Sequence, residues 1–148
     1  MGRTFEVGVR GVTAAAGAAY ATLQTPTGRL RLRELGFFAS TAVAASIGLG
    51  RAANSFVTTT SAVGQTRDPS DTVAALGIMG TAWSTAPTVP GVFTRRIVLP
   101  AVIGAGVIWT WPADPLIVPV HGAAISLVLW NFGAGAGPAP DIYAIWEE

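Results

Sequence analysis

Short apolar segments that alternate with polar residues recur along this chain, separated by proline and glycine, and this pattern constrains the fold more than any other feature. In TFEVGVRGV, near the start, Phe5, Val7 and Val9 fall on one face of an extended strand. Later segments of the same kind are VFTRRIVLP, GVIWTWP, PLIVPV, AAISLVLWNF and DIYAIWEE. Strands that recur at such intervals are typical of a sandwich or barrel.

We therefore predict an all-β fold, an antiparallel two-sheet sandwich that forms a jelly roll of about eight strands. The 148 residues are expected to form a single β-sandwich domain, 1–148. Residues 58–90 are rich in Thr, Ser, Gly and Pro, so we expect a long irregular connection there. The segment AAYATLQT, 18–25, fits either a strand paired with the first strand or a short helix.

The segment TGRLRLRELGFF alternates arginine with leucine and then becomes wholly apolar. A strand would place Arg29, Arg31 and Arg33 on one face. Strict alternation would also place Leu35 on that arginine face. A β-bulge at Glu34–Leu35 would return the later apolar residues to the core, and we predict one there.

The arginine row has four candidate partners: nucleic acid, a membrane surface, solvent at a sheet edge, and the acidic rim of another subunit. Nine basic residues against eight acidic ones argue against sequence-independent nucleic-acid binding, so we expect no specific nucleic acid. Arg95 and Arg96 form a second basic pair. The favoured partner is a carboxylate such as Glu147 or Glu148 on a neighbouring copy.

The chain is unusually apolar, with 51% hydrophobic and only 11% charged residues. The stretch from Pro115 to Pro140 has no formal charge, but internal proline, glycine and asparagine interrupt it. A spanning helix needs about 20 mostly apolar residues without such breaks, so we expect no membrane contact. The apolar surplus is then expected to be covered by other protein, including copies of this chain.

No catalytic constellation is visible, so we expect no enzymatic activity, no cofactor and no metal. The chain has no cysteine and one histidine, His121, which lacks a partner to orient it for acid–base work. Asp68 and Asp71 in RDPSD are expected to form a turn, because two carboxylates are too few oxygen ligands for calcium.

Trp109 and Trp111 are two residues apart and so share one strand face. We favour core or subunit-interface positions for the tryptophans; an exposed sugar-stacking platform is the alternative. The residues predicted at an interface are Arg29, Arg31, Arg33, Arg95, Arg96, Trp109, Trp111, Trp130, Trp146, Glu147 and Glu148.

Residues 95–148 contain a strand ending in a Trp-Pro turn, then SLVLWN, a Gly/Ala-rich loop and a final aromatic strand closing with WEE. Together with RLRELGFFAS, this region resembles small jelly-roll virion structural proteins of tailed bacteriophages, those that decorate or cement a capsid. The resemblance implies a non-enzymatic homotrimer on the capsid exterior, made in the host cytoplasm, that binds the major capsid protein. The alternative is a carbohydrate- or receptor-binding jelly-roll module of a phage tail or fibre.

Overall fold

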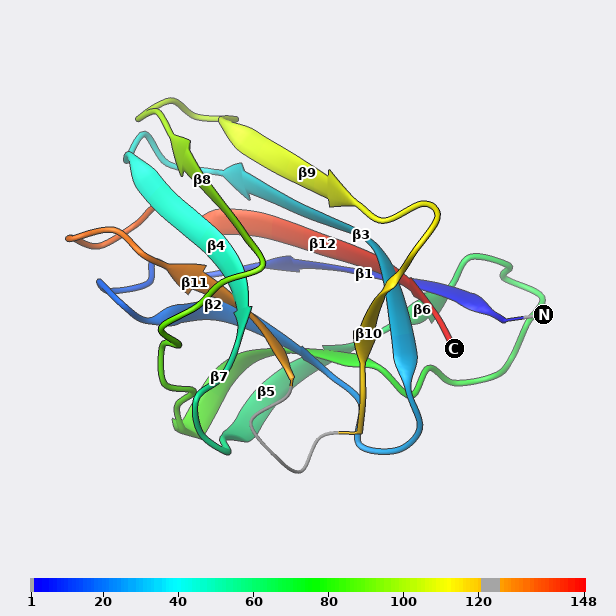
Figure 1. Ribbon diagram of the computed structural model, residues 1–148. Coiled ribbons are helices and arrows are strands. Elements are labelled where there is room, and N and C mark those ends of the chain that lie inside the picture. The colour runs from blue at the N-terminus through cyan, green and yellow to red at the C-terminus, as the bar shows by residue number, and fades with distance from the viewer. Residues whose placement is uncertain (1, 121–125) are drawn as a thin grey trace.

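The computed structural model describes residues 2–120 and 126–148, which form twelve strands and no helix (Figure 1). The strands lie in two antiparallel sheets of six strands each, which confirms the predicted all-β two-sheet sandwich. Their bounds are β1 (Thr4–Arg10), β2 (Ala19–Gln24), β3 (Leu30–Ala39), β4 (Ala45–Arg51), β5 (Val57–Val63), β6 (Gln65–Thr66), β7 (Ile78–Thr85), β8 (Arg95–Leu99), β9 (Gly106–Thr110), β10 (Leu116–Val118), β11 (Leu127–Asn131) and β12 (Pro140–Glu147).

The sheet that contains both ends of the described chain, sheet A, has the order β10-β3-β12-β1-β6. Strand β9 also pairs with β3, so β9 and β10 follow each other along the same side of β3. The second sheet, sheet B, has the order β5-β7-β2-β11-β4-β8. Strands β8 and β9 are therefore edge strands of opposite sheets, and they lie along the same side of the sandwich (Figure 1).

If β9 and β10 are counted as one strand, eight strands pair in a nested order that runs from the two ends of the chain inward. Strand β1 pairs with β12, β2 with β11, β3 with the β9–β10 segment, and β4 with β8. Strands β5, β6 and β7 are an excursion between β4 and β8 that adds strands to the other edge of each sheet. This excursion, and the division of one strand into β9 and β10, account for twelve strands where about eight were expected.

The hydrophobic core lies between the sheets and follows the period-two pattern of the sequence. In β12 the residues Ile142, Ala144 and Trp146 are buried, whereas the intervening Tyr143 and Ile145 face outward and are half-buried. Strand β11 departs from this pattern because all five of its residues are buried. Its outer side is covered by a second, smaller apolar cluster on sheet B, formed around Ala52, Phe56, Val128 and Trp130.

The predicted β-bulge in β3 is confirmed. Ile145 lies opposite Glu34 but Trp146 lies opposite Leu32, so Arg33 is the extra residue. The break falls at Arg33–Glu34, one residue earlier than expected. Before it Leu32 faces the core, and after it Leu35 does, with an exposed fraction of 4%.

Two expectations about connectivity are wrong. The segment 18–25 contains a strand, β2, but β2 pairs with β7 and β11 and not with β1. The chain crosses to the other sheet between β1 and β2, through a loop in which Gly17 has a φ of +70°. Residues 58–90 are not irregular throughout, since most of β5 and all of β6 and β7 lie within them. Strand β5 is threonine-rich, and β-branched residues favour extended backbone.

Candidate functional site

The tryptophans expected at an interface lie in the core of this chain. Trp130 and Trp146 have exposed fractions of 0%, and Trp111 has one of 8%. Trp109 is half-buried and packs against the main core from β9. Trp109 and Trp111 both turn toward the protein interior, so the structure offers no exposed sugar platform at these two residues.

The arginine row meets a carboxylate of its own chain. Arg33 Nη2 lies 2.9 Å from Glu147 Oε2, because β3 and β12 are neighbours in sheet A. Arg33 Nη1 also donates to the carbonyl of Pro112 at 2.9 Å. The hydrogen bond from Arg33 lowers the pKa of Glu147, and the charge of Arg31 lowers it further. The expected pairing between neighbouring copies is therefore replaced, for Arg33 and Glu147, by a pair within one chain.

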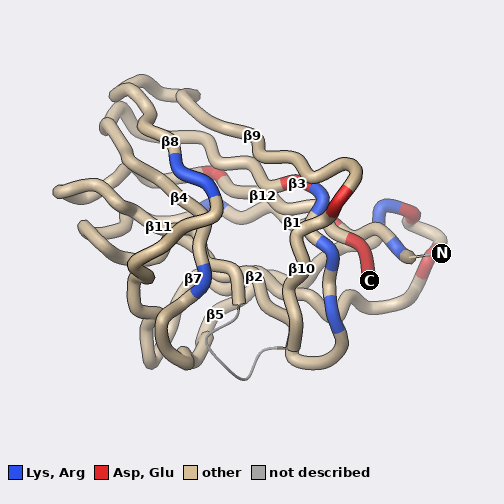
Figure 2. The backbone as a smooth tube through the Cα atoms, viewed as in Figure 1, with Lys and Arg blue, Asp and Glu red and all other residues tan. Residues whose placement is uncertain are grey.

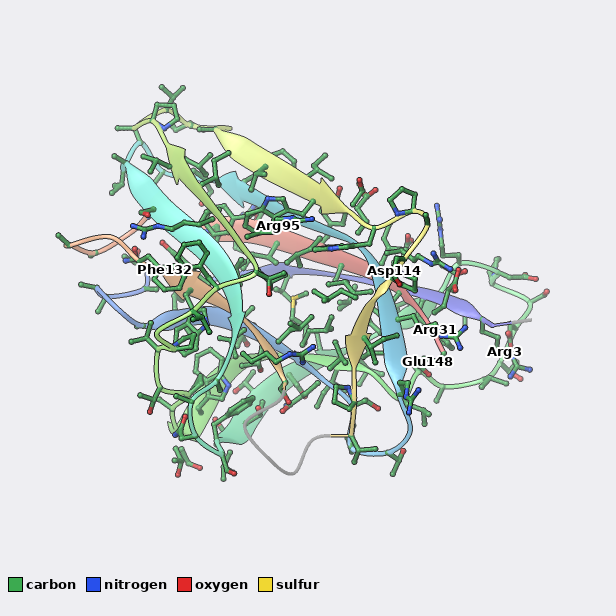
Figure 3. The ribbon with its side chains drawn as sticks, viewed as in Figure 1. Arg3, Arg31, Arg95, Asp114, Phe132 and Glu148 are labelled. Atoms are coloured by element: carbon green, nitrogen blue, oxygen red, sulfur yellow. The ribbon has the colours of Figure 1, made fainter. Side chains whose placement is uncertain are left out.

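Glu148 is likewise engaged inside the molecule. Its carboxylate accepts hydrogen bonds from the backbone N–H of Leu76 and of Gly77 and from the indole N–H of Trp146, at distances between 2.7 and 3.0 Å. Arg31, Asp114 and Glu148 lie at the end of the sandwich where the chain begins and ends, whereas Phe132 lies toward the opposite end (Figure 3). Arg29, just before β3, is exposed.

The second basic pair lies on the edge strand β8. The Arg96 guanidinium lies over the rings of Phe93 and Phe132, with its carbon 5.6 and 5.3 Å from their centroids. It also donates to the Ser46 hydroxyl at 3.0 Å. Arg95 is exposed beside it. Arg96 is thus held against aromatic rings of its own chain.

The acids of RDPSD form the expected turn. Asp68 accepts hydrogen bonds from the backbone N–H and hydroxyl of Ser70, and these bonds lower its pKa. Asp71 forms an ion pair with Arg3 at 2.8 Å. In the part of the chain that the structure describes, no three acidic or histidine side chains gather as metal ligands would. His121 lies outside the described residues.

One side of the sandwich carries almost no charge. Residues 35–50 and 97–113 contain no acidic or basic residue, and the pairing of β3 with β9 and of β4 with β8 brings these two segments together. Most charged residues gather instead near the two chain ends, although Arg95 and Arg96 at the start of β8 border this side (Figure 2). We call the exposed residues of the uncharged side the apolar edge; their exposed fractions are 39–71%, and they are Val43, Val98, Val102, Ile103 and Ile108. The sequence shows both uncharged runs, but only the strand pairing places them side by side.

A second unanticipated feature lies on the outer face of sheet A. A side chain at Gly36 would overlap the ring of Tyr143, and one at Gly106 would overlap the ring of Phe38, so both rings lie flat on backbone without side chains. The two rings are within 12° of parallel, with centroids 6.4 Å apart. We call these two rings and the glycines beneath them the aromatic face.

Open hollows lie on both sides of Tyr143. One, of about 610 Å³, is lined by Glu6, Gly8, Glu34 and Gln65 among others. The other, of about 440 Å³, is lined by Gly8, Arg10, Phe38 and Asp141 among others. The Tyr143 hydroxyl donates to Glu34 Oε1 at 2.6 Å. Desolvation and this bond raise the pKa of Tyr143 to about 12, so the hydroxyl stays protonated at neutral pH.

The described part of the chain contains no helix with the length and hydropathy of a membrane span. A comparison with protein-family models and with curated protein sequences finds no match to this chain.

Proposed function

We propose that this protein is a non-enzymatic structural subunit of a virus particle, a capsid decoration subunit that stabilises the shell by binding copies of itself and the major capsid protein. The observation that carries self-association is the apolar edge, where five exposed apolar side chains meet without a charged residue in the two segments that form most of it. The phage assignment is supported by the resemblance of residues 31–40 and 95–148 to such proteins.

The occupant we propose for the apolar edge is a second copy of this chain. Among the described residues β9 pairs only with β3 and β8 only with β4, so each has one side open to further pairing. Natural proteins usually protect such an edge with charge or proline, and β9 has neither within its bounds. Burial of apolar area there contributes about 25 cal/mol per Å² before the costs of association.

We also propose that the sandwich is a jelly roll with an inserted excursion. The nested pairing of β1 with β12, β2 with β11, β3 with β9–β10 and β4 with β8 supports this assignment, because it is the order produced by folding one long antiparallel hairpin into two sheets. Jelly rolls are frequent in capsid proteins, so the assignment agrees with the proposed function.

Light scattering after size exclusion tests self-association. We expect an oligomer, a trimer, at micromolar concentration, and we expect the double variant Val102→Asp/Ile103→Asp to shift it to the monomer. The control is Val57→Asp, since Val57 is 54% exposed on β5 at the opposite edge of sheet B. A wild-type protein that is monomeric at this concentration would contradict self-association.

A capsid or portal gene beside the coding sequence is expected from the virion assignment, and neighbouring genes of metabolism would contradict it.

The alternative, a carbohydrate-binding module of a phage tail or fibre, needs aromatic rings accessible to a ligand. The tryptophans do not supply them, but Tyr143 and Phe38 lie on an outer face beside open hollows. This observation favours glycan binding as a second activity of the same chain, and it leads to the inference below.

A further inference from the structure

The aromatic face presents two half-buried aromatic rings on the outer side of sheet A. Tyr143 rests on Gly36 of β3, and Phe38 of the same strand rests on Gly106 of β9. Each ring occupies the space above a different glycine, and the two nearly parallel rings, with centroids 6.4 Å apart, together form a platform. Such a platform matches the C–H face of a pyranose, which is apolar although the edge of the sugar is rich in hydroxyls.

Polar groups border this platform on both sides. Glu6, Glu34 and Gln65 line the larger hollow, and Arg10 and Asp141 line the smaller one. Carboxylate, amide and guanidinium groups are planar and form paired hydrogen bonds, which suits adjacent sugar hydroxyls. A few polar groups around an apolar floor are typical of small-molecule sites.

We propose that the aromatic face and its two hollows bind a neutral glycan, with pyranose rings on Tyr143 and Phe38 and their hydroxyls toward Glu34, Glu6 and Asp141. The three carboxylates bordering the platform exceed the single arginine that lines the hollows. An acidic sugar would therefore be repelled, whereas a neutral sugar can donate its hydroxyl protons to these acceptors.

A second copy of the chain fits this face less well. The surface is hollowed on both sides of Tyr143, and its acids are already hydrogen-bonded or ion-paired: Glu34 with Tyr143, Asp141 with Arg10 and Glu6 with Arg67. Burying these pairs against protein would carry a desolvation cost that the uncharged apolar edge does not. Glycan binding does not depend on the self-association proposed above.

Calorimetric titration with neutral hexasaccharides tests the proposal, with cellohexaose, xylohexaose and chitohexaose as neutral probes and polygalacturonate as the acidic probe. We expect binding to at least one neutral probe and weaker or no binding to polygalacturonate. Tyr143→Ala should weaken binding at least tenfold, and Tyr143→Phe, which keeps the ring, should change it less than threefold. The control Phe93→Ala, which removes an exposed ring beside Phe132, should leave binding unchanged.

Gly8→Gln tests the same site without removing a ring that packs on the sheet. Gly8 lines both hollows, and a Cβ atom there has no neighbour closer than 4.0 Å, so the variant is expected to fold and to obstruct the site. The proposal is overturned if no neutral probe binds at millimolar concentration, if Tyr143→Ala and Gly8→Gln bind as the wild type does, or if polygalacturonate binds best. Dissociation of an oligomer by Gly8→Gln would also overturn it, because a second copy would then occupy the face. Loss of the oligomer in Val102→Asp/Ile103→Asp with glycan binding intact would leave this proposal standing and separates it from the proposed function.

Discussion

Single glycines determine the shape of the outer face of sheet A. Gly36 lies in the middle of β3, where a side chain would normally strengthen a strand by packing against its neighbours. Its lack of one lets the Tyr143 ring lie against the backbone, with the hydroxyl at Glu34. Gly8 on β1 also lies on this face, but the space above it is open. Both glycines leave a strand without a side chain, but only Gly36 has an aromatic ring packed on it. Comparing substitutions at the two positions therefore isolates the effect of the ring contact on stability.

Gly36→Ala should therefore destabilise the protein, whereas Gly8→Ala should not. The added methyl at Gly36 must displace the Tyr143 ring, and overpacking of this kind costs about 1–3 kcal/mol. At Gly8 the methyl meets nothing nearer than 4.0 Å, so the change should stay within about 1 kcal/mol. Urea denaturation midpoints of both variants measure the difference in stability. Equal midpoints would show that the placement of the Tyr143 ring does not require a glycine at position 36.

The Arg33–Glu147 pair should make stability depend on pH in the acid range. Because folding lowers the pKa of Glu147, its contribution is present above the unfolded pKa of about 4.3 and disappears as the pH falls through the lower folded value. At neutral pH the pair is expected to stabilise the protein by about 1 kcal/mol.

Glu147→Gln should thus lower the free energy of unfolding at pH 7 and leave it nearly unchanged at pH 3. Urea denaturation at the two pH values measures this. The control is Glu6→Gln, because Glu6 and Arg67 are more exposed and lie 3.4 Å apart, so its effect should be smaller at both pH values. A Glu147→Gln effect that is the same at pH 3 and pH 7 would contradict the role assigned to the pair.

At the scale of strands, the local pattern predicted which segments are extended but not how they pair. The alternation in TFEVGVRGV correctly predicted the inward face of β1, and the parity change at Glu34–Leu35 predicted the bulge, which lies one residue earlier. The pairing of β2 with β11, more than 100 residues away, has no local signal. The irregular connection expected over residues 58–90 is wrong for the same reason, since most of β5 and all of β6 and β7 lie there.

The carboxylate of Glu148 joins β12 to the start of β7. Glu148→Ala would remove the acceptor for the amides of Leu76 and Gly77 and leave the indole N–H of Trp146 buried without its partner, which costs about 1–3 kcal/mol. Glu148→Gln keeps one acceptor oxygen and should lose much less. Hydrogen exchange should become faster at Leu76 and Gly77 in the alanine variant than in the glutamine variant. Equal exchange in the two would contradict the proposed link.

At the scale of the whole molecule, charge is distributed unevenly. The ion pairs Arg3–Asp71 and Arg33–Glu147 lie near the chain ends, while the apolar edge lies on segments without charge (Figure 2). The self-association proposed above uses this edge, because monomeric proteins rarely leave large apolar patches uncovered. The sequence could not locate this surface, since its two uncharged segments are about 60 residues apart and meet only through β3–β9 and β4–β8.

Self-association through the apolar edge should be insensitive to salt. Ionic screening weakens contacts between opposite charges, but it does not weaken burial of apolar area. We expect the oligomer to dissociate no more readily at 1 M than at about 0.1 M sodium chloride, as measured by sedimentation at several protein concentrations. Dissociation at high salt would instead assign the contact to the arginines, including Arg29, Arg31 and Arg95.

The amino-acid sequence by itself determined that the chain is a sandwich of short strands, which faces of β1 and β3 turn inward, and that polar surface is scarce. These properties follow from the period-two geometry of a strand and from composition, which are local or additive. Only the tertiary structure decided that Arg33 meets Glu147 of its own chain, that the tryptophans turn inward, and that Tyr143 lies on Gly36. Each of these depends on which distant strands become neighbours, and that is set by the packing of the whole core.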